Sequence, residues 1–387
     1  DYTNGTASIL LEPQSTNLIT YSEDFSNAFW TKTGASIVSD SATSPDGTLN
    51  ADKLVEDTST GDHYLYKFIA SPSQSKQSFS VFVKDSGDGR FVRITTNDGV
   101  NGWNYYFNPM TGQEVSSTFT TSKIISLPNG WYRIELMADG ANYVTFGTVP
   151  FVVLLSNNGT SSSYTGDGTS GIYIYGAQLE EGSYPTSYIP TEGSTVTRAA
   201  ETLNNAANSD LINSTEGVLY LDINYKNIQS AWQGIALTND NSESNRIFIG
   251  TALNTKTLEI YFQSGGVVLW QPDFELSNIN QTQKIAVKYK SNDLALWVNG
   301  VEVATSNSVT TMPVGLSLLG FFGFGTSEPQ YGAIKCVAVF KEALSDTELA
   351  CLTSTNNREI FLNYYYRMQY VGANTEALSC AEQTFNI

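Results

Sequence analysis

The stretch KIAVKYKSNDLALWVNGVEV, residues 284–303, predicts two β-strands joined by a Ser-Asn-Asp turn and followed by an Asn-Gly hairpin turn. Apolar residues alternate along both strands, and the inward set is Ile285, Val287, Tyr289, Leu294, Leu296 and Val298. The opposite face of the second strand carries Ala295 and Trp297, where a solvent-exposed face would usually carry Ser, Thr or Lys. A bulky indole at this place predicts a sheet whose outer face touches a partner.

The same alternation, punctuated by Gly, Asn, Asp and Ser, recurs along the whole chain and predicts an all-β fold. A chain of 387 residues is too long for one ordinary core, so we expect two cores. The alternation is lost in residues 180–208, which are rich in Pro, Gly, Ser and Thr. We therefore expect two tandem β-sandwich domains of the jelly-roll type, at residues 1–190 and 209–355, with a linker at residues 191–208.

One short helix is expected near the end of the second domain, where Ser345 is a candidate N-cap and Glu348 stands in capping-box position. Residues 356–387 are too aromatic for a solvated tail. We expect this C-terminal extension to pack on a domain or on a neighbouring subunit. The chain starts without Met or a signal peptide, which indicates a fragment or a processed product.

The charge balance argues against two classes of partner. The chain has 38 acidic and 20 basic residues, a formal net charge of -18. Such a chain repels a phosphate backbone and an anionic membrane surface, so we expect no nucleic-acid partner. The longest apolar runs are too short for a spanning helix, so we also expect no membrane insertion.

The three cysteines, Cys336, Cys351 and Cys380, lie in the last fifth of the chain and allow at most one disulfide. His63 is the single histidine and the sequence has no CxxC pair, so we expect no structural zinc. A catalytic triad would depend on His63, and the sequence has no Gly-x-Ser-x-Gly elbow. No strand sets two carboxylates on one face for glycoside hydrolysis. We therefore expect no catalytic residues and no enzyme activity, although a lyase that uses Tyr stays open.

Two groups of passages have a specific pattern. The first group is residues 17–54 (NLITYSEDFSNAFWTKTGASIVSDSATSPDGTLNADKL), 129–136 (NGWYRIEL) and 172–201, and the second is residues 216–225 (EGVLYLDINY), 284–303 and 331–353 (YGAIKCVAVFKEALSDTELACLT). Through the first group, the first 200 residues resemble the carbohydrate-binding-like jelly-roll domain of bacteriophage tail fibres, head fibres and related virion proteins. Through the second group, the second half is similar to the concanavalin-like or laminin-G-like lectin domain that often follows it. Residues 353–387 fall outside it.

The resemblance implies a non-catalytic fibre or adhesin module on the virion surface that binds a host cell-surface polysaccharide. It also implies other virion proteins as neighbours and a homo-oligomer whose avidity offsets weak single sites, the trimer being the usual state in such families. Two alternatives remain open: a structural virion assembly module, and a glycan-binding part of a polysaccharide-degrading enzyme.

Aromatic side chains are the natural glycan-binding candidates, because a pyranose offers a patch of C–H bonds that stacks on a flat ring. The candidates that alternation or loop position places outside a core are Trp103, Tyr106, Trp232, Tyr261, Trp270 and Trp297. Packing against another domain, the C-terminal extension or a sister chain would use the same residues.

Two oxygen-rich loops are candidates for calcium. They carry Asp85 and Asp88 in one segment and Asp167 in the other. No EF-hand pattern is present, and such sequences also form plain turns. We expect no cofactor, with calcium at these aspartates as the alternative.

Overall fold

The computed structural model describes residues 9–70, 73–201, 207–225, 232–251, 255–278, 281–321 and 332–354. In these ranges the chain is built from β-strands with two short α-helices, which confirms the all-β prediction. None of the described helices has the length and apolar character that a membrane span requires. The chain divides into two compact units. We call residues 14–199 the first unit, and residues 1–13 with 200–387 the second unit.

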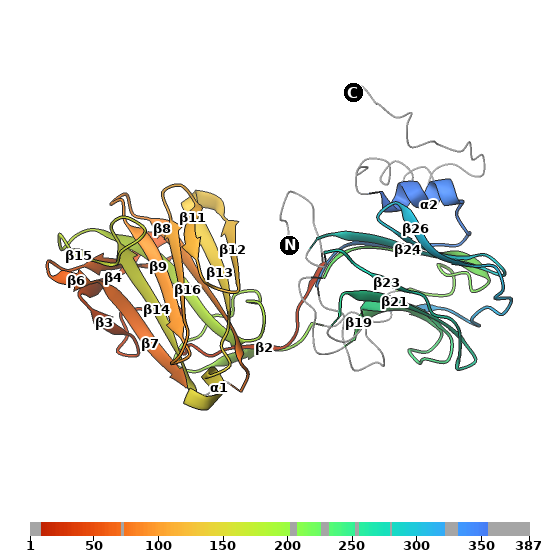
Figure 1. Ribbon diagram of the computed structural model, residues 1–387, viewed down its shortest axis with the longest axis horizontal. Coiled ribbons are helices and arrows are strands. Elements are labelled where there is room, and N and C mark those ends of the chain that lie inside the picture. Colours follow the sequence, from red (N-terminus) through yellow and green to blue (C-terminus); the bar gives the residue numbers. More distant parts are fainter. Residues whose placement is uncertain are drawn as a thin grey trace, which may run out of the picture. The chain divides into compact units, whose positions relative to one another are not determined.

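The first unit is a sandwich of two six-stranded sheets (Figure 1). Sheet 1 has the order β11-β10-β9-β14-β7-β3. Its strands are β3 Thr31–Thr33, β7 Tyr64–Ala70, β9 Phe91–Asn97, β10 Gly102–Asn108, β11 Gln113–Ser117 and β14 Thr148–Ser156. Sheet 2 has the order β12-β13-β8-β16-β5-β4. Its strands are β4 Ala35–Thr43, β5 Leu49–Glu56, β8 Lys76–Asp85, β12 Thr121–Ser126, β13 Trp131–Asp139 and β16 Gly171–Glu181.

Smaller elements complete the first unit. Two short pairs are β2 Ser15–Asn17 with β17 Val196–Arg198, and β6 Thr60–Asp62 with β15 Ser163–Thr165. The helical turns are η2 Pro128–Gly130 and α1 Tyr143–Phe146, which the sequence did not lead us to expect.

The core of the first unit lies between the two sheets and follows the alternation of the strands. Sheet 1 contributes the buried Leu65, Ile94 and Phe151, and sheet 2 contributes Phe79 and Ile134 among others. Because successive strand residues point to opposite faces, every second residue of sheet 1 is turned to the outside.

The second unit is also a sandwich. Sheet 3 has the order β1-β28-β18-β24-β25-β26, and sheet 4 has the order β22-β21-β20-β19-β27 with β23 paired to β21. The strands of sheet 3 are β1 Ile9–Leu11, β18 Glu216–Asn224, β24 Gln283–Lys290, β25 Leu294–Val298, β26 Val301–Ser306 and β28 Gly332–Phe340. The strands of sheet 4 are β19 Gln233–Thr238, β20 Arg246–Thr251, β21 Thr257–Ser264, β22 Val267–Trp270, β23 Asp273–Glu275 and β27 Leu318–Gly320.

The stretch at residues 284–303 forms the strands β24, β25 and the start of β26, as predicted. Val287 faces Leu296 across the β24–β25 pair, and both side chains lie in the core. Asn299 and Gly300 take the positive φ angles that a hairpin turn with an Asn-Gly pair requires, 51° and 90°.

The expected domain boundaries need two changes. β1 was expected in the first domain, but it pairs with β28, with Ile9 opposite Ile334, and so belongs to the second unit. β17 lies inside the expected linker, yet it pairs with β2 in the first unit. Local alternation identifies a strand and says nothing of a partner that lies far away in sequence, which is why both assignments differ.

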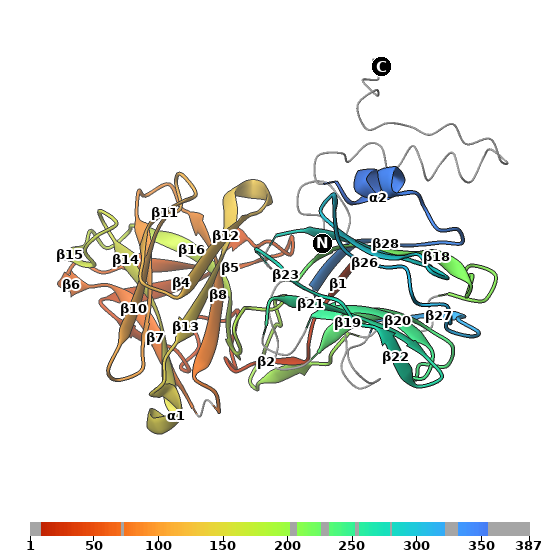
Figure 2. The same cartoon turned by 45° about the vertical axis from the view of Figure 1, so that its right-hand side comes forward.

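The predicted helix is present as α2, Asp346–Thr353, and both hydrogen bonds of the capping box at Ser345 and Glu348 are made. Figures 1 and 2 show α2 on the outer side of sheet 3, beside β24 and β26. Near this helix, Cys336 is a free thiol and Cys351 is disulfide-bonded. The expected packing of the C-terminal extension, residues 356–387, lies outside the described residues.

Candidate functional site

Trp297 points away from the core of the second unit, as its alternation predicts, but it is not accessible. Its side chain is only 7% exposed. It packs in a cluster between sheet 3 and α2 that contains Val218, Tyr220, Ala286, Ala295, Phe340, Leu344 and Leu349. The partner that the exposed-looking indole predicted is therefore a helix of the same chain, and the expectation of a free ligand-binding indole at this place is corrected.

Polar contacts fix α2 in this position. Lys288 is buried beside the helix, and its Nζ lies 2.6 Å from Asp293 Oδ1 and 3.1 Å from Asp346 Oδ1. Lys284 Nζ donates to the carbonyl oxygen of Ser354 at 2.8 Å. A buried ammonium is stable only when it is paired, so these contacts tie the helix to the sheet.

Trp103 is a core residue rather than a surface aromatic. It is 8% exposed, and its ring stacks on Tyr143 with centroids 5.7 Å apart. With Tyr105 and Phe107 it forms the inward row of β10. The outward row of the same strand therefore contains Asn104 and Tyr106.

Tyr106 lies on an outer face of sheet 1 that the neighbouring strand β7 makes strongly aromatic. Tyr64, Tyr66 and Phe68 alternate there against the core residues of β7, and Tyr64 and Tyr66 are half-buried whereas Phe68 is 54% exposed. The Tyr64 and Tyr66 ring centroids are 5.7 Å apart, and those of Tyr66 and Phe68 are also 5.7 Å apart. These three rings form a continuous ladder along one strand.

Strand pairing places the ladder and Tyr106 on the same face. Tyr64 is opposite Leu154 of β14, Leu154 is opposite Arg93 of β9, and Arg93 is opposite Tyr106 of β10. The Arg93 guanidinium carbon lies 5.5 Å from the centroid of the Tyr106 ring. A ring, an aliphatic side chain, a cation and a second ring thus follow one another across the sheet.

Arg93 is held in place by neutral side chains. Its Nε and Nη2 donate to Asn104 Oδ1 at 3.1 and 2.6 Å, and its Nη1 donates to Ser162 Oγ at 3.0 Å. We refer to the set Tyr64, Tyr66, Phe68, Arg93, Asn104 and Tyr106 as the aromatic face. It is the candidate functional site of the first unit.

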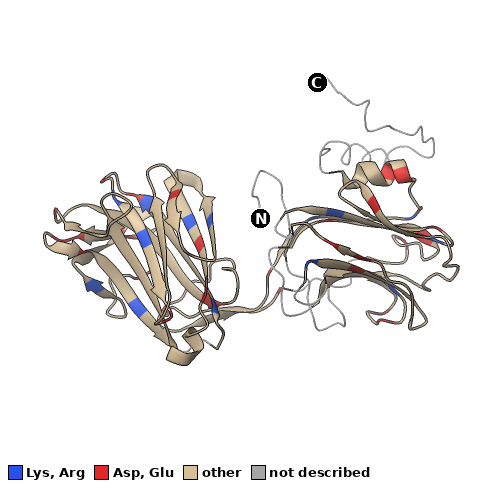
Figure 3. Ribbon diagram, viewed as in Figure 1, with Lys and Arg blue, Asp and Glu red and all other residues tan. Residues whose placement is uncertain are grey.

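The side chains of the aromatic face carry no negative charge. Five of the six strands of sheet 1 (β3, β7, β9, β10 and β14) contain no Asp or Glu, as the absence of red along them in Figure 3 illustrates, and the edge strand β11 contains one, Glu114. Within the described residues Arg93 has no carboxylate partner. In a chain with a net charge of -18, this face is therefore an exception to the general surface.

Sequence reasoning found Tyr106 and missed the ladder. The segment Tyr64-Leu65-Tyr66-Lys67-Phe68 carries aromatics at every second position of a predicted strand, with Leu65 between them. An alternating row of rings opposite an apolar core residue is the signal that identifies such a face.

Trp232 and Tyr261 are brought together on the outer face of sheet 4. Their rings meet edge to face at 6.0 Å, and the Tyr261 hydroxyl donates to Glu259 Oε2 at 2.9 Å. Arg246, fully buried, lies 5.6 Å from the Tyr261 ring and 5.3 Å from that of Phe248. Burial first, and then the neighbouring Glu259, raise the pKa of Tyr261 to about 12. With Tyr261 only 9% exposed, this cluster presents less ring surface than the aromatic face.

Trp270 does not join that cluster. It ends β22 opposite Phe262, whose side chain is in the core, and it packs half-buried against the core of the second unit. The three tryptophan candidates of the second unit, Trp232, Trp270 and Trp297, therefore lie in three different environments.

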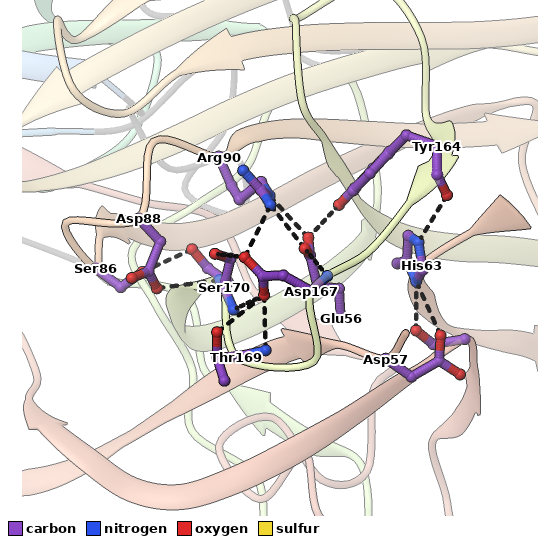
Figure 4. Close-up of polar contacts among 12 residues, drawn as sticks. Glu56, Asp57, His63, Ser86, Asp88, Arg90, Tyr164, Asp167, Thr169 and Ser170 are labelled. Atoms are coloured by element: carbon purple, nitrogen blue, oxygen red, sulfur yellow. Dashed lines mark hydrogen bonds and ion pairs between the residues drawn. The ribbon is translucent and has the colours of Figure 1, made fainter. Parts of the chain in front are cut away.

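The carboxylates of all three calcium candidates already accept or pair with groups of the chain, as Figure 4 shows for Asp88 and Asp167. Asp167 Oδ1 accepts from the backbone N–H of Thr169 and of Ser170 at 2.8 and 2.7 Å. Asp88 Oδ2 lies 2.7 Å from Lys53 Nζ, and Asp85 Oδ1 accepts from a backbone N–H of its own turn. The described residues contain no group of three or more Asp, Glu, His or Cys side chains that could hold a metal ion.

Next to these loops, a buried carboxylate and the single histidine are both engaged in structural contacts (Figure 4). Glu56 accepts two hydrogen bonds from Arg90 at 2.7 Å each and one from the Tyr164 hydroxyl at 2.6 Å. Burial raises the pKa of Glu56, but these hydrogen bonds outweigh burial and hold it below its ordinary value. His63 is buried, with Nδ1 2.6 Å from the carbonyl oxygen of Gly34 and Nε2 3.2 Å from that of Tyr164.

Comparison with known proteins identifies a lectin-like fold in the second unit. Residues 220–350 match the family described as Concanavalin A-like lectin/glucanases superfamily. This match confirms the concanavalin-like domain expected in the second half of the chain. No curated protein sequence matches the chain.

Several solved structures are similar to parts of the chain. A CBM40 domain of a Ruminococcus gnavus IT-sialidase, bound to α2,3-sialyllactose, is 14% identical, with 40% of this chain and 97% of that domain covered and a TM-score of 0.33. A SAP-like pentraxin from Limulus polyphemus is 14% identical, with coverages of 41% and 77% and a TM-score of 0.32. Domains LG4-5 of the mouse laminin α1 chain are 8% identical, with coverages of 73% and 86% and a TM-score of 0.26. At these identities none of them assigns a ligand to this chain.

Proposed function

We propose that the protein is a glycan-binding module and that the aromatic face of the first unit is its binding surface. One observation carries the proposal: the ladder Tyr64, Tyr66 and Phe68 stands on the outer face of a sheet with its rings partly open to solvent. Natural monomeric proteins rarely leave rows of rings uncovered without a use for them.

The chemistry of the face suits a saccharide. Flat rings stack on the C–H patches of pyranoses, while hydroxyl and amide groups beside them bind sugar hydroxyls. The Tyr64, Tyr66 and Tyr106 hydroxyls and the Asn104 amide supply such groups in the present case. Because tyrosine loses little side-chain entropy on binding, rows of it suit weak sites that are used many times.

More specifically, we propose that the module is a non-catalytic part of a phage fibre at the virion surface. Its role there is to adsorb to a host cell-surface polysaccharide. The resemblance of residues 17–54 and 172–201 to phage fibre domains supports this, as does the lectin-like fold of the second unit. A homo-oligomer such as a trimer, held with other virion proteins, would make several weak sites act together. The buried Glu56, fully engaged by Arg90 and Tyr164, supports a structural rather than catalytic use of that carboxylate.

The test compares the wild-type protein with a Tyr64→Ala/Tyr66→Ala double variant on a glycan array that carries bacterial surface polysaccharides. The control is Tyr173→Ala, which removes a half-buried tyrosine from sheet 2. We expect the double variant to lose about tenfold or more in affinity, since each stacked ring contributes on the order of 1 kcal/mol. The control should bind as the wild type does.

Light scattering on the same samples separates the alternatives. Binding lost with the oligomer intact supports the glycan-binding function. If no glycan is bound by the wild type, or the double variant binds as well as the control, the proposal is wrong. Loss of the oligomer in the double variant would instead favour the structural assembly module.

A further inference from the structure

We propose that the aromatic face takes an acidic saccharide, and that Arg93 binds its anionic group while Tyr64 and Tyr66 stack on neighbouring sugar rings. The inference rests on the proposed function and adds the chemical class of the ligand. The observation behind the inference is that Arg93 has no acidic partner among the described residues.

Arg93 differs from the other arginines of the first unit that have ion pairs. Arg90 Nη2 lies 2.7 Å from Glu56 Oε1, and Arg133 Nη1 lies 3.2 Å from Glu135 Oε1. Arg93 instead has the neutral acceptors Asn104 and Ser162. A guanidinium held by neutral acceptors keeps its full positive charge available to an anionic ligand.

The guanidinium of Arg93 has hydrogen-bonding capacity left for a ligand. A guanidinium carries five N–H groups, and the contacts to Asn104 and Ser162 use three of them. One N–H on each terminal nitrogen remains, and two such groups match the two oxygens of a carboxylate. The contacts to Asn104 and Ser162 also hold the guanidinium in place before binding, which lowers the entropy cost of capturing an anion.

The surroundings of Arg93 favour an oligosaccharide over a small anion. Two strand spacings separate Tyr64 from Arg93 across Leu154, about 10 Å in a sheet of normal geometry. That is longer than one pyranose ring, so a sugar on Tyr64 and an acid group at Arg93 belong to different residues of one chain. The absence of Asp and Glu from the five strands removes the repulsion that such a chain would meet elsewhere.

The net charge of -18 does not oppose this local recognition at physiological salt. Exposed charges farther away than about 8 Å are largely screened there, whereas a direct guanidinium contact is not. The whole protein would therefore slow the approach of an acidic glycan more than it would weaken the bound state.

The experiment uses the full chain at physiological ionic strength and matched glycan pairs. Oligogalacturonate carries carboxylates that are neutral methyl esters in its esterified form, so the pair has the same sugar chain with and without the charge. A glycan array adds other uronate-bearing, sulfated and neutral members. The variants are Arg93→Gln and Arg93→Lys, with Lys76→Gln as the control that removes one exposed positive charge from sheet 2. Thermal unfolding of each variant establishes that it is folded.

We expect acidic glycans to bind about tenfold or more better than their neutral counterparts, and Arg93→Gln to remove that preference by weakening acidic binding far more than neutral binding. Hydrogen bonds to charged groups of this kind are worth roughly 10- to 100-fold. Arg93→Lys should recover only part of the preference, because an ammonium is not bidentate, and Lys76→Gln should change nothing.

Failure of this inference is distinguishable from failure of the proposed function. Neutral glycans bound as well as acidic ones, through Tyr64 and Tyr66 and regardless of the Arg93 variants, would overturn the acidic assignment and leave the function standing. A preference for sulfated over uronate glycans that still depends on Arg93 supports the inference and names the anion. Absence of any glycan binding overturns both.

Discussion

The outer faces of sheet 1 and sheet 3 both carry aromatic side chains that alternate against a core, but they differ in what lies over them. On sheet 3, α2 covers Trp297. On sheet 1, the Tyr64, Tyr66 and Phe68 ladder stays partly open to solvent. Alternation along a strand therefore predicts whether a ring points away from the core. Whether that ring is then buried by another element or remains on the surface depends on parts of the chain that are distant in sequence.

The two faces also differ in the side chains that surround their rings. Trp297 is surrounded by apolar side chains such as Val218, Ala295 and Leu349. The ladder shares its face with Arg93, Asn104 and hydroxyl groups. An apolar setting is typical of packing between elements, whereas a mixed aromatic and polar setting is typical of ligand sites.

The largest predicted difference between the two faces is the effect of removing a ring on the free energy of unfolding. We expect Trp297→Ala to lower the free energy of unfolding of the second unit by about 3–5 kcal/mol, because it leaves a cavity under α2. Tyr66→Ala, made on the open face, should cost about 1 kcal/mol or less. Urea unfolding of both variants checks the pair, and equal costs would mean that the two faces are equally covered.

A second prediction is that the stabilities of the two units depend differently on pH. Burial raises the pKa of Asp52 in β5 to about 6, against 3.8 in an unfolded chain. Between these values Asp52 in the folded first unit binds a proton that the unfolded chain releases, so the contribution of Asp52 to stability falls as the pH rises from about 4 to about 6. The total change is about 2 kcal/mol or less, and the second unit should not share it.

Asp52→Asn provides the control for that prediction. The variant cannot titrate, so unfolding midpoints compared at pH 4.5 and 6.5 should show a smaller decline than in the wild type. An identical pH dependence in the two proteins would mean that Asp52 does not change its protonation on folding.

A third prediction concerns helix α2, which covers Trp297, and its expected effect on stability is smaller. Ser345→Ala removes the N-cap of α2 and should cost about 1 kcal/mol. The loosened helix should expose Trp297, so acrylamide should quench tryptophan fluorescence more strongly than in the wild type or in the exposed turn variant Ser291→Ala. Unchanged quenching would show that side chains other than the helix bury the indole.

The smallest effect on stability is expected on the open face. Thr31 is exposed opposite Tyr66 at the edge of sheet 1, so Thr31→Glu should change stability by no more than about 0.5 kcal/mol. The new carboxylate should nevertheless weaken binding of acidic glycans severalfold, whereas Thr31→Gln should not. Equal binding by the two variants would place the ligand elsewhere.

Local patterns predicted the local elements of this fold. The alternation of residues 284–303 and the capping box at Ser345 identified β24, β25 and α2 because neighbours in sequence determine them. The covering of Trp297 and the pairing of β1 could not be predicted, since each depends on an element that lies far away in sequence, with other strands between. The ladder on β7 was predictable, because its rings alternate within one strand.

The pairing of β1 with β28 sets a constraint on synthesis. Ile9 is opposite Ile334, so β1 is synthesised before the whole first unit and β28 after it. At ordinary rates of translation this interval lasts on the order of tens of seconds, in which the first unit has time to fold. Sheet 3 can therefore be completed only after β28 has been made, by pairing it with a strand that was synthesised before the first unit.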